Sequence, residues 1–394
     1  MLIHMADLLQ HARRNGYAVG GYDIVSLEFL EAIVAACERD GAPAILSLAE
    51  SHFHHYDFAT LMPAVVEAAR RAQVPFAIHL DHGASQDSVI QAIRLGCNGV
   101  MVDGSHLPYA DNVALTREVV AIAHGCGIPV EAELGYVPGV EGEDAALHPG
   151  ELRMTEPEEA ARFVADTGVD CLAVSVGTVH GRMRGTPVLD FARLAAIRDA
   201  VGIPLVIHGG TGLSDEQYRR LVESGMTKLN YYTALADAAS ASIRAQVEAM
   251  PGGGYTQLLA GVRAAIAQEV SRMNALLGAS GRAAQVAAQC RPWREVLHAI
   301  GFNVAGELPP QAREELLREG VRRLSAIPGV RSVEAGVALR GEARYHYCWN
   351  IRFAAPEVVA SYANHPIHRD YADRLFRPAA ADRLTIDYSL DYHG

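Results

Sequence analysis

The first 235 residues alternate between two hydrophobic patterns. Short, almost continuously apolar runs, such as APAILSLA at 42–49 and CLAVSVG at 171–177, predict buried β-strands. Longer segments between them, such as SLEFLEAIVAACERDG at 26–41, have the spacing of amphipathic helices, and several end at a glycine. Continuously apolar strands are typical of parallel sheets that helices cover on both faces.

This alternation occurs eight times. The predicted strands lie at 18–24, 42–49, 76–81, 99–105, 129–135, 171–177, 204–210 and 228–233. Eight such units predict an α/β fold of the (β/α)8 TIM barrel type. Further helices are expected at 235–250 and 255–277, and the barrel domain at 1–283.

The pattern changes after residue 283. We interpret residues 284–296 as a linker, because they form a short polar segment. Residues 297–394 then follow the order strand, helix, strand, strand, helix, helix, strand. That order predicts a small, ferredoxin-like antiparallel α+β domain rather than an extension of the barrel.

Composition and charge narrow the classes of function. The net charge of −12 argues against binding to nucleic acid or to anionic membranes, so a phosphate on a ligand has to be held locally. The six cysteines are scattered, without a CxxC pair, and no apolar run approaches the roughly 20 residues of a membrane span. The first 16 residues form a charged amphipathic helix rather than a secretory signal, so we expect a cytoplasmic protein.

Histidines and acids gather at the predicted carboxyl ends of the strands, where (β/α)8 enzymes carry their chemistry. His82, His180 and His208 follow three different strands. One histidine at a strand end is more often structural, but three at matching positions favour a metal site. Three imidazoles with an open fourth position are typical of catalytic zinc, which polarises carbonyl groups. Other polar residues at these ends are Asp81, Asp103, Glu131, Glu133 and Asn230.

Two glycine-rich loops follow the sixth and seventh strands. Their sequences, GTVHGRMRG at 177–185 and HGGTGL at 208–213, expose backbone N–H groups where this fold often binds phosphate. A third stretch, SHFHHY at 51–56, also has the composition of a metal motif, but we interpret it as a polar loop away from the metal.

Several motifs together resemble the zinc-dependent class II ketose-bisphosphate aldolases, in their tagatose- and fructose-bisphosphate branch. They are AIHLDHG, VMVDGSHLPYADN, VEAELG, GTVHG, VLDFARL, HGGTGLSDE and GASGRA, in that order within 1–283. Residues 297–392 resemble the stress-responsive α/β-barrel domain, which commonly dimerises. The motifs there are IPGVRSVEAG, YHYCWNIRF and ANHPIHRDY.

The resemblance implies a role for each site residue. His82, His180 and His208 would bind the zinc that polarises the carbonyl of dihydroxyacetone phosphate. Asp81 would shuttle the proton of the aldol hydroxyl, and Glu141 would remove the C3 proton of the donor. The reaction would be the reversible cleavage of a ketose phosphate to dihydroxyacetone phosphate and an aldehyde.

Other positions are implied to bind a second metal or the phosphate. Asp103 and Glu133 match positions that can hold a second divalent metal, and a polar network explains them equally well. The implied phosphate cradle consists of Gly181, Arg184, Gly209, Thr211, Asn230 and Thr233. The family often uses a monovalent cation near this cradle. A homo-oligomer, dimer or tetramer, with contacts through both domains, is also implied.

The sequence departs from the family on the side that holds the aldehyde. Asp23 replaces the usual asparagine, and Ala49 replaces a common serine. Tyr231 and Tyr232 replace smaller residues, while Arg282 could still reach a distal phosphate across a subunit interface. A carboxylate in this place repels a phosphate dianion, so we expect an acceptor altered from that of fructose 1,6-bisphosphate.

Alternative functions remain open. The chain could be a true fructose- or tagatose-bisphosphate aldolase, or an impaired metal-binding barrel that acts as a scaffold or sensor. An amidohydrolase is disfavoured because the first strand ends in YDI rather than in an HxH pair. A Schiff-base aldolase is disfavoured because only Lys228 lies on a predicted barrel strand.

Overall fold

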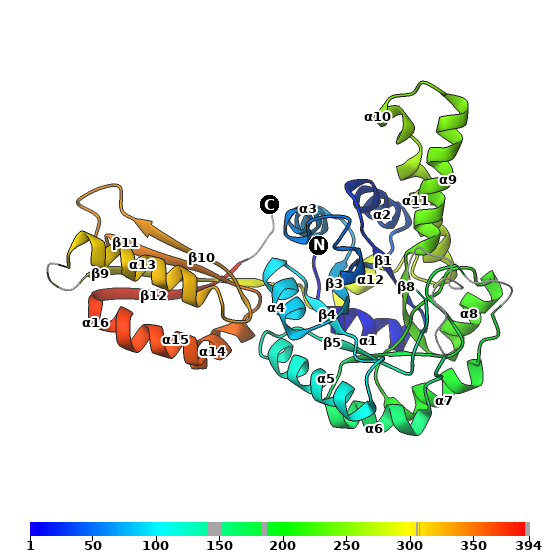
Figure 1. Ribbon diagram of the computed structural model, residues 1–394, viewed down its shortest axis with the longest axis horizontal. Helices are drawn as coiled ribbons and strands as arrows, with labels where there is room; N and C mark the ends of the chain where they lie inside the picture. Colours follow the sequence, from blue (N-terminus) through cyan, green and yellow to red (C-terminus); the bar gives the residue numbers. More distant parts are fainter. Residues whose placement is uncertain (140–151, 183–186, 305, 307, 391–394) are drawn as a thin grey trace. The chain divides into compact units, whose positions relative to one another are not determined.

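The chain forms two compact units, which are described separately (Figure 1). The first consists of Met1–Val89, Cys97–Val120 and Pro129–Pro292, and the second consists of Trp293–Gly394 together with the short segments Ile90–Gly96 and Ala121–Ile128. The predicted site residues Glu141 and Arg184 lie outside the described residues. The computed structural model describes residues 1–139, 152–182, 187–304, 306 and 308–390.

Eight parallel strands close into a barrel in the order β1 to β8, which confirms the predicted TIM barrel. Nearly every strand residue is buried, as expected for strands enclosed by helices. The strands are β1 (Val19–Asp23), β2 (Ala44–Ala49), β3 (Phe76–Gly83), β4 (Gly99–Val102), β5 (Val130–Leu134), β6 (Cys171–Val174), β7 (Leu205–Ile207) and β8 (Met226–Tyr231).

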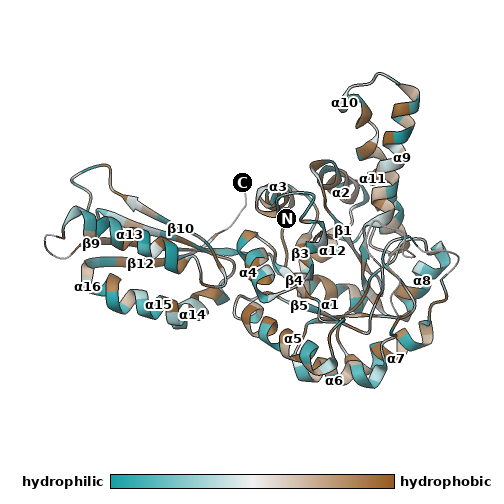
Figure 2. Ribbon diagram, viewed as in Figure 1, coloured by the Kyte–Doolittle hydropathy of each residue, from teal (hydrophilic) through white to brown (hydrophobic). Residues whose placement is uncertain are grey.

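Helices surround the barrel strands, and they carry both hydrophobic and hydrophilic residues (Figure 2). Several end at a glycine in the left-handed region, which is open to glycine without a steric penalty; Gly41 after α2 has a φ of 58°. The helices up to β8 are α1 (Met5–Asn15), α2 (Leu27–Asp40), α3 (Phe58–Arg71), α4 (Gln86–Leu95), α5 (Tyr109–His124), α6 (Pro157–Thr167), α7 (Phe191–Val201) and α8 (Asp215–Ser224).

The helices after β8 differ from the sequence prediction in one respect. Helix α9 (Thr233–Ala249) is close to the predicted range, but the predicted helix 255–277 is divided into α10 (Tyr255–Leu258) and α11 (Val262–Leu276). The break falls at Gly261, where an added Cβ would lie 2.6 Å from Oγ of Ser242. The close approach of α9 at this point therefore requires a glycine.

The segment 284–289 belongs to helix α12 (Ala283–Gln289). The last two residues of the predicted linker 284–296 already belong to the next strand, which begins at Glu295. Helix α12 belongs to the barrel unit. Its residue Val286 is fully buried in the same apolar cluster as Leu8 and Tyr17. Helix α12 therefore packs against the amino end of the barrel.

The C-terminal domain is the predicted antiparallel α+β unit. Its four-stranded sheet has the order β10-β11-β9-β12. One face carries Phe302, Trp349 and Phe353 into a core with the helices, and Phe376 packs edge-on against Phe302. Its elements are β9 (Glu295–Val304), α13 (Pro310–Leu324), β10 (Val330–Val337), β11 (Tyr347–Phe353), α14 (Glu357–Asn364), α15 (Pro366–Tyr371), the π-helix η3 (Ala372–Phe376), α16 (Arg377–Ala379) and β12 (Ala380–Leu390). Among the described helices of the chain, none is both long and apolar enough to cross a bilayer.

Candidate active site

The end of strand β3 brings Asp81 and His82 to the same place. Successive residues of a regular strand point to opposite faces, so a continuous β3 would separate these two side chains. His82 instead has a φ of 47°, and the pairing of β3 with β4 shifts between Leu80 and Gly83. Among the described non-glycine residues only His82 has a positive φ, which is a strained geometry typical of functional sites.

Three imidazoles converge at the carboxyl ends of the strands. His82, His180 and His208 form a group whose potential ligand atoms all lie within 4.8 Å of one another. The Nε2 atom of His82 lies 2.8 Å from Nδ1 of His208. The ring centroids of His82 and His180 are 4.9 Å apart. The structure thus brings together the three histidines that the sequence analysis selected.

The opposite nitrogen of each ring faces an oxygen. Nδ1 of His82 donates to Oδ2 of Asp103 at 2.8 Å, and Nδ1 of His180 donates to the carbonyl oxygen of Val137 at 3.1 Å. Nε2 of His208 lies 2.9 Å from Oε1 of Glu131, which accepts its proton. Metal-binding histidines are held in this way, because the hydrogen bond fixes the tautomer and the ring orientation.

These contacts test whether the residues fit a metal. With their other nitrogens donating, neutral His82 and His208 would direct two lone pairs at each other across 2.8 Å. A shared proton or a metal cation removes this repulsion. Although burial lowers the pKa of His82, the charges of Asp81 and Asp103 raise it more, so the ring gains a proton when no metal is bound. The donor set therefore fits a cation, with three nitrogen ligands suitable for zinc.

Asp81 is buried beside the three rings. It is 1% exposed, and its Oδ1 accepts a hydrogen bond of 2.7 Å from Nδ2 of Asn230 on β8. Burial raises the pKa of Asp81, but the surrounding charges, with His82 and His208 foremost, lower it by a larger total. The pKa of Asp81 therefore lies below its ordinary value. Asp81 is thus an oriented carboxylate at the edge of the candidate metal site.

A second group of ligand atoms adjoins the first. His82, Asp103 and Glu133 also offer atoms within 4.8 Å of one another. Burial and the charge of Asp103 raise the pKa of Glu133 to about 8. Oε1 of Glu133 accepts a long hydrogen bond of 3.4 Å from the backbone of Val137. A second cation here would neutralise the two carboxylates, although the contact of Asp103 with His82 already gives it a structural role.

A buried network behind His208 involves residues for which the sequence predicted no role. Oε2 of Glu131 accepts a hydrogen bond of 2.6 Å from Nζ of Lys228, and His79 lies 3.5 Å from the same Nζ. All three side chains are 0% exposed. Burial lowers the pKa of Lys228, but the charges of Glu131 and Asp81 and the other groups around it together raise the pKa above its usual value. This lysine therefore stays charged and is unsuited to Schiff-base formation. The sequence feature that could have identified Glu131 is strand alternation, which places its side chain on the same face as that of Glu133.

Comparisons with known proteins agree with this geometry. Residues 3–282 match the family model for class II fructose-bisphosphate aldolase, and residues 296–390 match the stress-responsive A/B barrel domain. The chain belongs to the class II fructose-bisphosphate aldolase family. Its C-terminal unit is a stress-responsive barrel domain, and its family supports a lyase activity.

Solved structures of aldolases resemble the barrel. The YdjI aldolase of Escherichia coli K12 is 32% identical, with a TM-score of 0.65, over 72% of this chain and 100% of its own. A Coccidioides immitis protein of the fructose-1,6-bisphosphate aldolase type is 31% identical, with a TM-score of 0.66, over 72% and 98%. A fructose-bisphosphate aldolase of Campylobacter jejuni is 19% identical, with a TM-score of 0.60 over 71% and 96%, and shares the fold.

The described parts of the glycine-rich loops after β6 and β7 pack against each other. Gly209 has a φ of 66°, and a Cβ on it would lie 2.9 Å from the backbone nitrogen of His180. Gly181 also has a positive φ, of 81°. The loops therefore need glycine for close backbone approach, which leaves their N–H groups available for an anion. Thr211 follows in the β7 loop, and Thr233 is buried at the start of α9.

The departures from the family fall in different places. Asp23 and Ala49 are buried at the ends of β1 and β2, and Ala49 pairs with Asp81 in register. Tyr231 points away from the barrel interior, since its hydroxyl donates to Oε1 of Glu269 on α11 at 2.5 Å. The ring of the next residue, Tyr232, instead packs against the ring of His52, with centroids 4.3 Å apart.

His52 is a buried residue that the sequence analysis assigned to a polar loop. It ends a short 3-10 helix (Glu50–His52) after β2 and is 4% exposed. Neither ring nitrogen has a hydrogen-bond partner in the described part of the chain. Burial lowers its pKa to about 4, with a smaller opposing effect from Asp81, so the ring is neutral. Within the described residues, none of the candidate metal groups includes a histidine of 51–56.

Arg282 lies at the other end of the barrel. Its guanidinium is 5.2 Å from the ring centroid of Tyr17, which stands just before β1. The amino ends of parallel strands are opposite to the catalytic ends. Within one chain, Arg282 is therefore not part of the site, and a role in phosphate binding would require another subunit.

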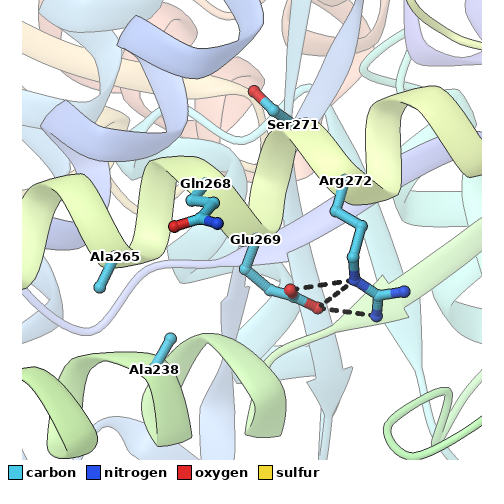
Figure 3. Close-up of a pocket in the computed structure, with 6 residues that line it drawn as sticks. All are labelled: Ala238, Ala265, Gln268, Glu269, Ser271 and Arg272. Carbon is cyan, nitrogen blue, oxygen red and sulfur yellow. Dashed lines mark hydrogen bonds and ion pairs between the residues drawn. The ribbon is translucent and has the colours of Figure 1, made fainter.

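A separate cavity of about 510 Å³ lies between α9 and α11 (Figure 3). Glu269 and Arg272 form an ion pair of 2.9 Å on its wall. The residues that line it include none of the three histidines, so it is distinct from the candidate active site.

Proposed function

We propose that the protein is a zinc-dependent class II aldolase. It cleaves a ketose phosphate reversibly to dihydroxyacetone phosphate and an aldehyde. The observation that carries this proposal is the arrangement of His82, His180 and His208, whose outward nitrogens all donate to oxygens. The ligand atoms are then Nε2 of His82, Nε2 of His180 and Nδ1 of His208. Zinc bound there supplies a Lewis acid that polarises the substrate carbonyl.

Asp81 carries the proton of the aldol hydroxyl in this proposal. As a carboxylate it accepts this proton during cleavage, and it returns the proton during condensation. Asn230 holds Asp81 through its amide, which fixes the carboxylate next to the reacting oxygen. Glu141 is proposed as the group that moves the C3 proton of the donor. Asp103 and Glu133 are proposed to hold a second divalent cation.

The donor phosphate is proposed to bind at the loops after β6 and β7. Gly181, Gly209 and Thr211 would offer backbone N–H groups and a hydroxyl, with Asn230 and Thr233 beside them. Arg184 would add a positive charge, and a monovalent cation would bind near this cradle. On this side Asn230 and Thr233 match the family pattern, and Thr211 and Arg184 replace a serine and a lysine conservatively, which supports dihydroxyacetone phosphate as the donor.

The acceptor side is proposed to bind an aldehyde without a phosphate. Asp23 repels a dianion, and Ala49 offers no hydroxyl to it. The neutral imidazole of His52, packed on Tyr232, offers one donor and one acceptor to a hydroxylated aldehyde. A hydroxyl-rich acceptor therefore suits these residues better than glyceraldehyde 3-phosphate.

The test compares two substrates before and after removal of metal. We expect faster cleavage of a ketose 1-phosphate than of fructose 1,6-bisphosphate, loss of both activities with a chelator, and recovery with zinc. A strong preference for the bisphosphate would overturn the altered acceptor but keep the aldolase. Full activity after verified removal of metal would overturn the metal-dependent mechanism.

The C-terminal domain is proposed to join two copies of the chain. The face of its sheet that the helices leave open carries Leu384, Ile386 and Tyr388, which are 48%, 36% and 47% exposed. An antiparallel sheet with an apolar open face is suited to an isologous contact. Within the described residues none of the six cysteines forms a disulfide bond, which supports the further proposal of a reducing, cytoplasmic location.

A further inference from the structure

The C-terminal domain contains a cavity of its own, with a volume of about 250 Å³. It lies between the helix-covered face of the sheet and the helices. Ile300 on β9 and Thr385 on β12 are paired in register and line it from the sheet. Tyr362 on α14 and Tyr371 on α15 line it from the helices. The proposed aldol reaction does not use this cavity.

Aromatic rings form the inner wall of the cavity. Trp349 and Tyr371 meet edge to face, with centroids 6.3 Å apart, and Phe376 lies beside them. Trp349 is 1% exposed, and its indole N–H has no acceptor in the described part of the chain. A buried donor without an acceptor is unusual in a folded protein and is satisfied by a ligand or an ordered water. These surfaces favour a flat, aromatic ligand that carries an oxygen.

The remaining polar lining is basic. Arg377, Arg383, His298 and His368 contribute to the wall, and no described lining residue is a carboxylate. Arg377 is paired with Asp373, and His298 lies 2.6 Å from Oδ1 of Asp387. Arg383, in contrast, makes no ion pair with any described residue, and it lies opposite Phe302 in the register of β12 and β9. An exposed guanidinium at the rim of an aromatic cavity favours an anionic group, and a planar carboxylate matches its geometry.

We propose that this cavity binds a small aromatic carboxylate, with the ring against Trp349 and Tyr371 and the carboxylate on Arg383. The volume admits a single substituted ring, because drug-sized ligands need about 300–1,000 Å³. The site is a second ligand site of the protein, and it does not depend on the chemistry of the barrel.

The experiment measures benzoate and benzamide binding to the full-length protein by calorimetry. These molecules share the ring and differ in charge. We expect benzoate to bind at least about tenfold more tightly than benzamide. Arg383→Gln should remove this preference and leave the affinity for benzamide unchanged. Arg318→Gln, which changes an exposed arginine of α13 in the same domain, should change neither affinity.

Further ligands and a second variant locate the site. Hexanoate tests the aromatic wall and should bind more weakly than benzoate. Thr385→Phe narrows the cavity from the exposed strand β12 and should weaken both aromatic ligands. Equal binding of benzoate and benzamide, equal binding of hexanoate, or unchanged benzoate binding in Arg383→Gln would each overturn the proposal. An absence of benzoate binding at about 10 mM would also overturn it.

Discussion

The barrel and the C-terminal domain bury different kinds of side chain. The barrel interior holds Glu131, Lys228 and His79 at 0% exposure, directly behind a metal-binding candidate. The core of the C-terminal domain is instead aromatic, with Trp349 and Phe302 at its centre. Burial of charge costs free energy unless each group is paired. The buried charges of the barrel therefore lower its stability but orient the candidate metal ligands, whereas the aromatic core of the C-terminal domain mainly stabilises the fold of that domain.

The largest effect is expected from removal of a metal ligand. His208→Ala should lower kcat/KM for aldol cleavage by about 10³-fold or more, because several kcal/mol of charge stabilisation depend on the metal. Steady-state kinetics and metal analysis of the same preparation measure this. His368→Ala in the C-terminal domain is the matched control and should retain activity. Similar losses in both variants would contradict the contrast between the domains.

The next effect separates proton transfer from metal binding. Asp81→Asn should lower kcat by about 10²–10⁴-fold, the usual contribution of a general acid–base group. Its zinc content should stay at the wild-type level, because the three histidines are unchanged. Asp190→Asn removes the cap of α7 and serves as the control. Loss of zinc together with activity in Asp81→Asn would assign this carboxylate to the metal site instead.

A smaller effect is expected from the network behind His208. Glu131→Gln should weaken zinc binding by about 10–100-fold, as changes to a partner of a metal ligand do. Competition with a chromogenic chelator measures the affinity. Glu295→Gln changes a buried carboxylate of the C-terminal domain, which pairs with Arg331 and Arg352, and should leave the affinity unchanged.

Zinc affinity should also depend on pH. The raised pKa of His82 means that the metal-free site holds a proton that zinc must displace. The affinity should therefore rise with pH, by about tenfold per pH unit for one released proton, until pH exceeds that pKa. Calorimetry in buffers of different ionisation enthalpy counts the protons. Zinc binding without proton release at pH 7 would contradict a protonated His82.

The smallest effect tests the aromatic core. Gly320 on α13 faces Trp349, and an added Cβ would overlap that ring and lie 2.5 Å from the hydroxyl of Tyr371. Gly320→Ala should destabilise the C-terminal domain by about 1–3 kcal/mol through overpacking. Denaturant unfolding followed by tryptophan fluorescence measures this change. Activity of the barrel should not change, and a large loss of activity would mean that the two units are energetically coupled.

Sequence patterns predicted most of the fold because both domains follow simple periodicities. The strand ends also identified His82, His180 and His208, since these ends meet at one face of a barrel. The partners of these histidines were harder to predict. Alternation placed Glu131 on the inner face but could not show that it contacts His208, because that contact joins residues 77 positions apart.

Other features depend on three-dimensional context alone. The positive φ of His82 has no signature in the local sequence, because histidine normally avoids this region. The burial of His52 was missed because its neighbours His54 and His55 are polar and exposed, as in a surface loop. The break at Gly261 was missed because a single glycine often continues a helix.

The most direct test is a crystal structure of the zinc-loaded protein with anomalous data at the zinc edge. We expect a strong peak bound by Nε2 of His82, Nε2 of His180 and Nδ1 of His208, with Glu131 still hydrogen-bonded to the far side of the His208 ring. No peak between these three rings at saturating zinc, or coordination through Nε2 of His208, would contradict the proposed metal site.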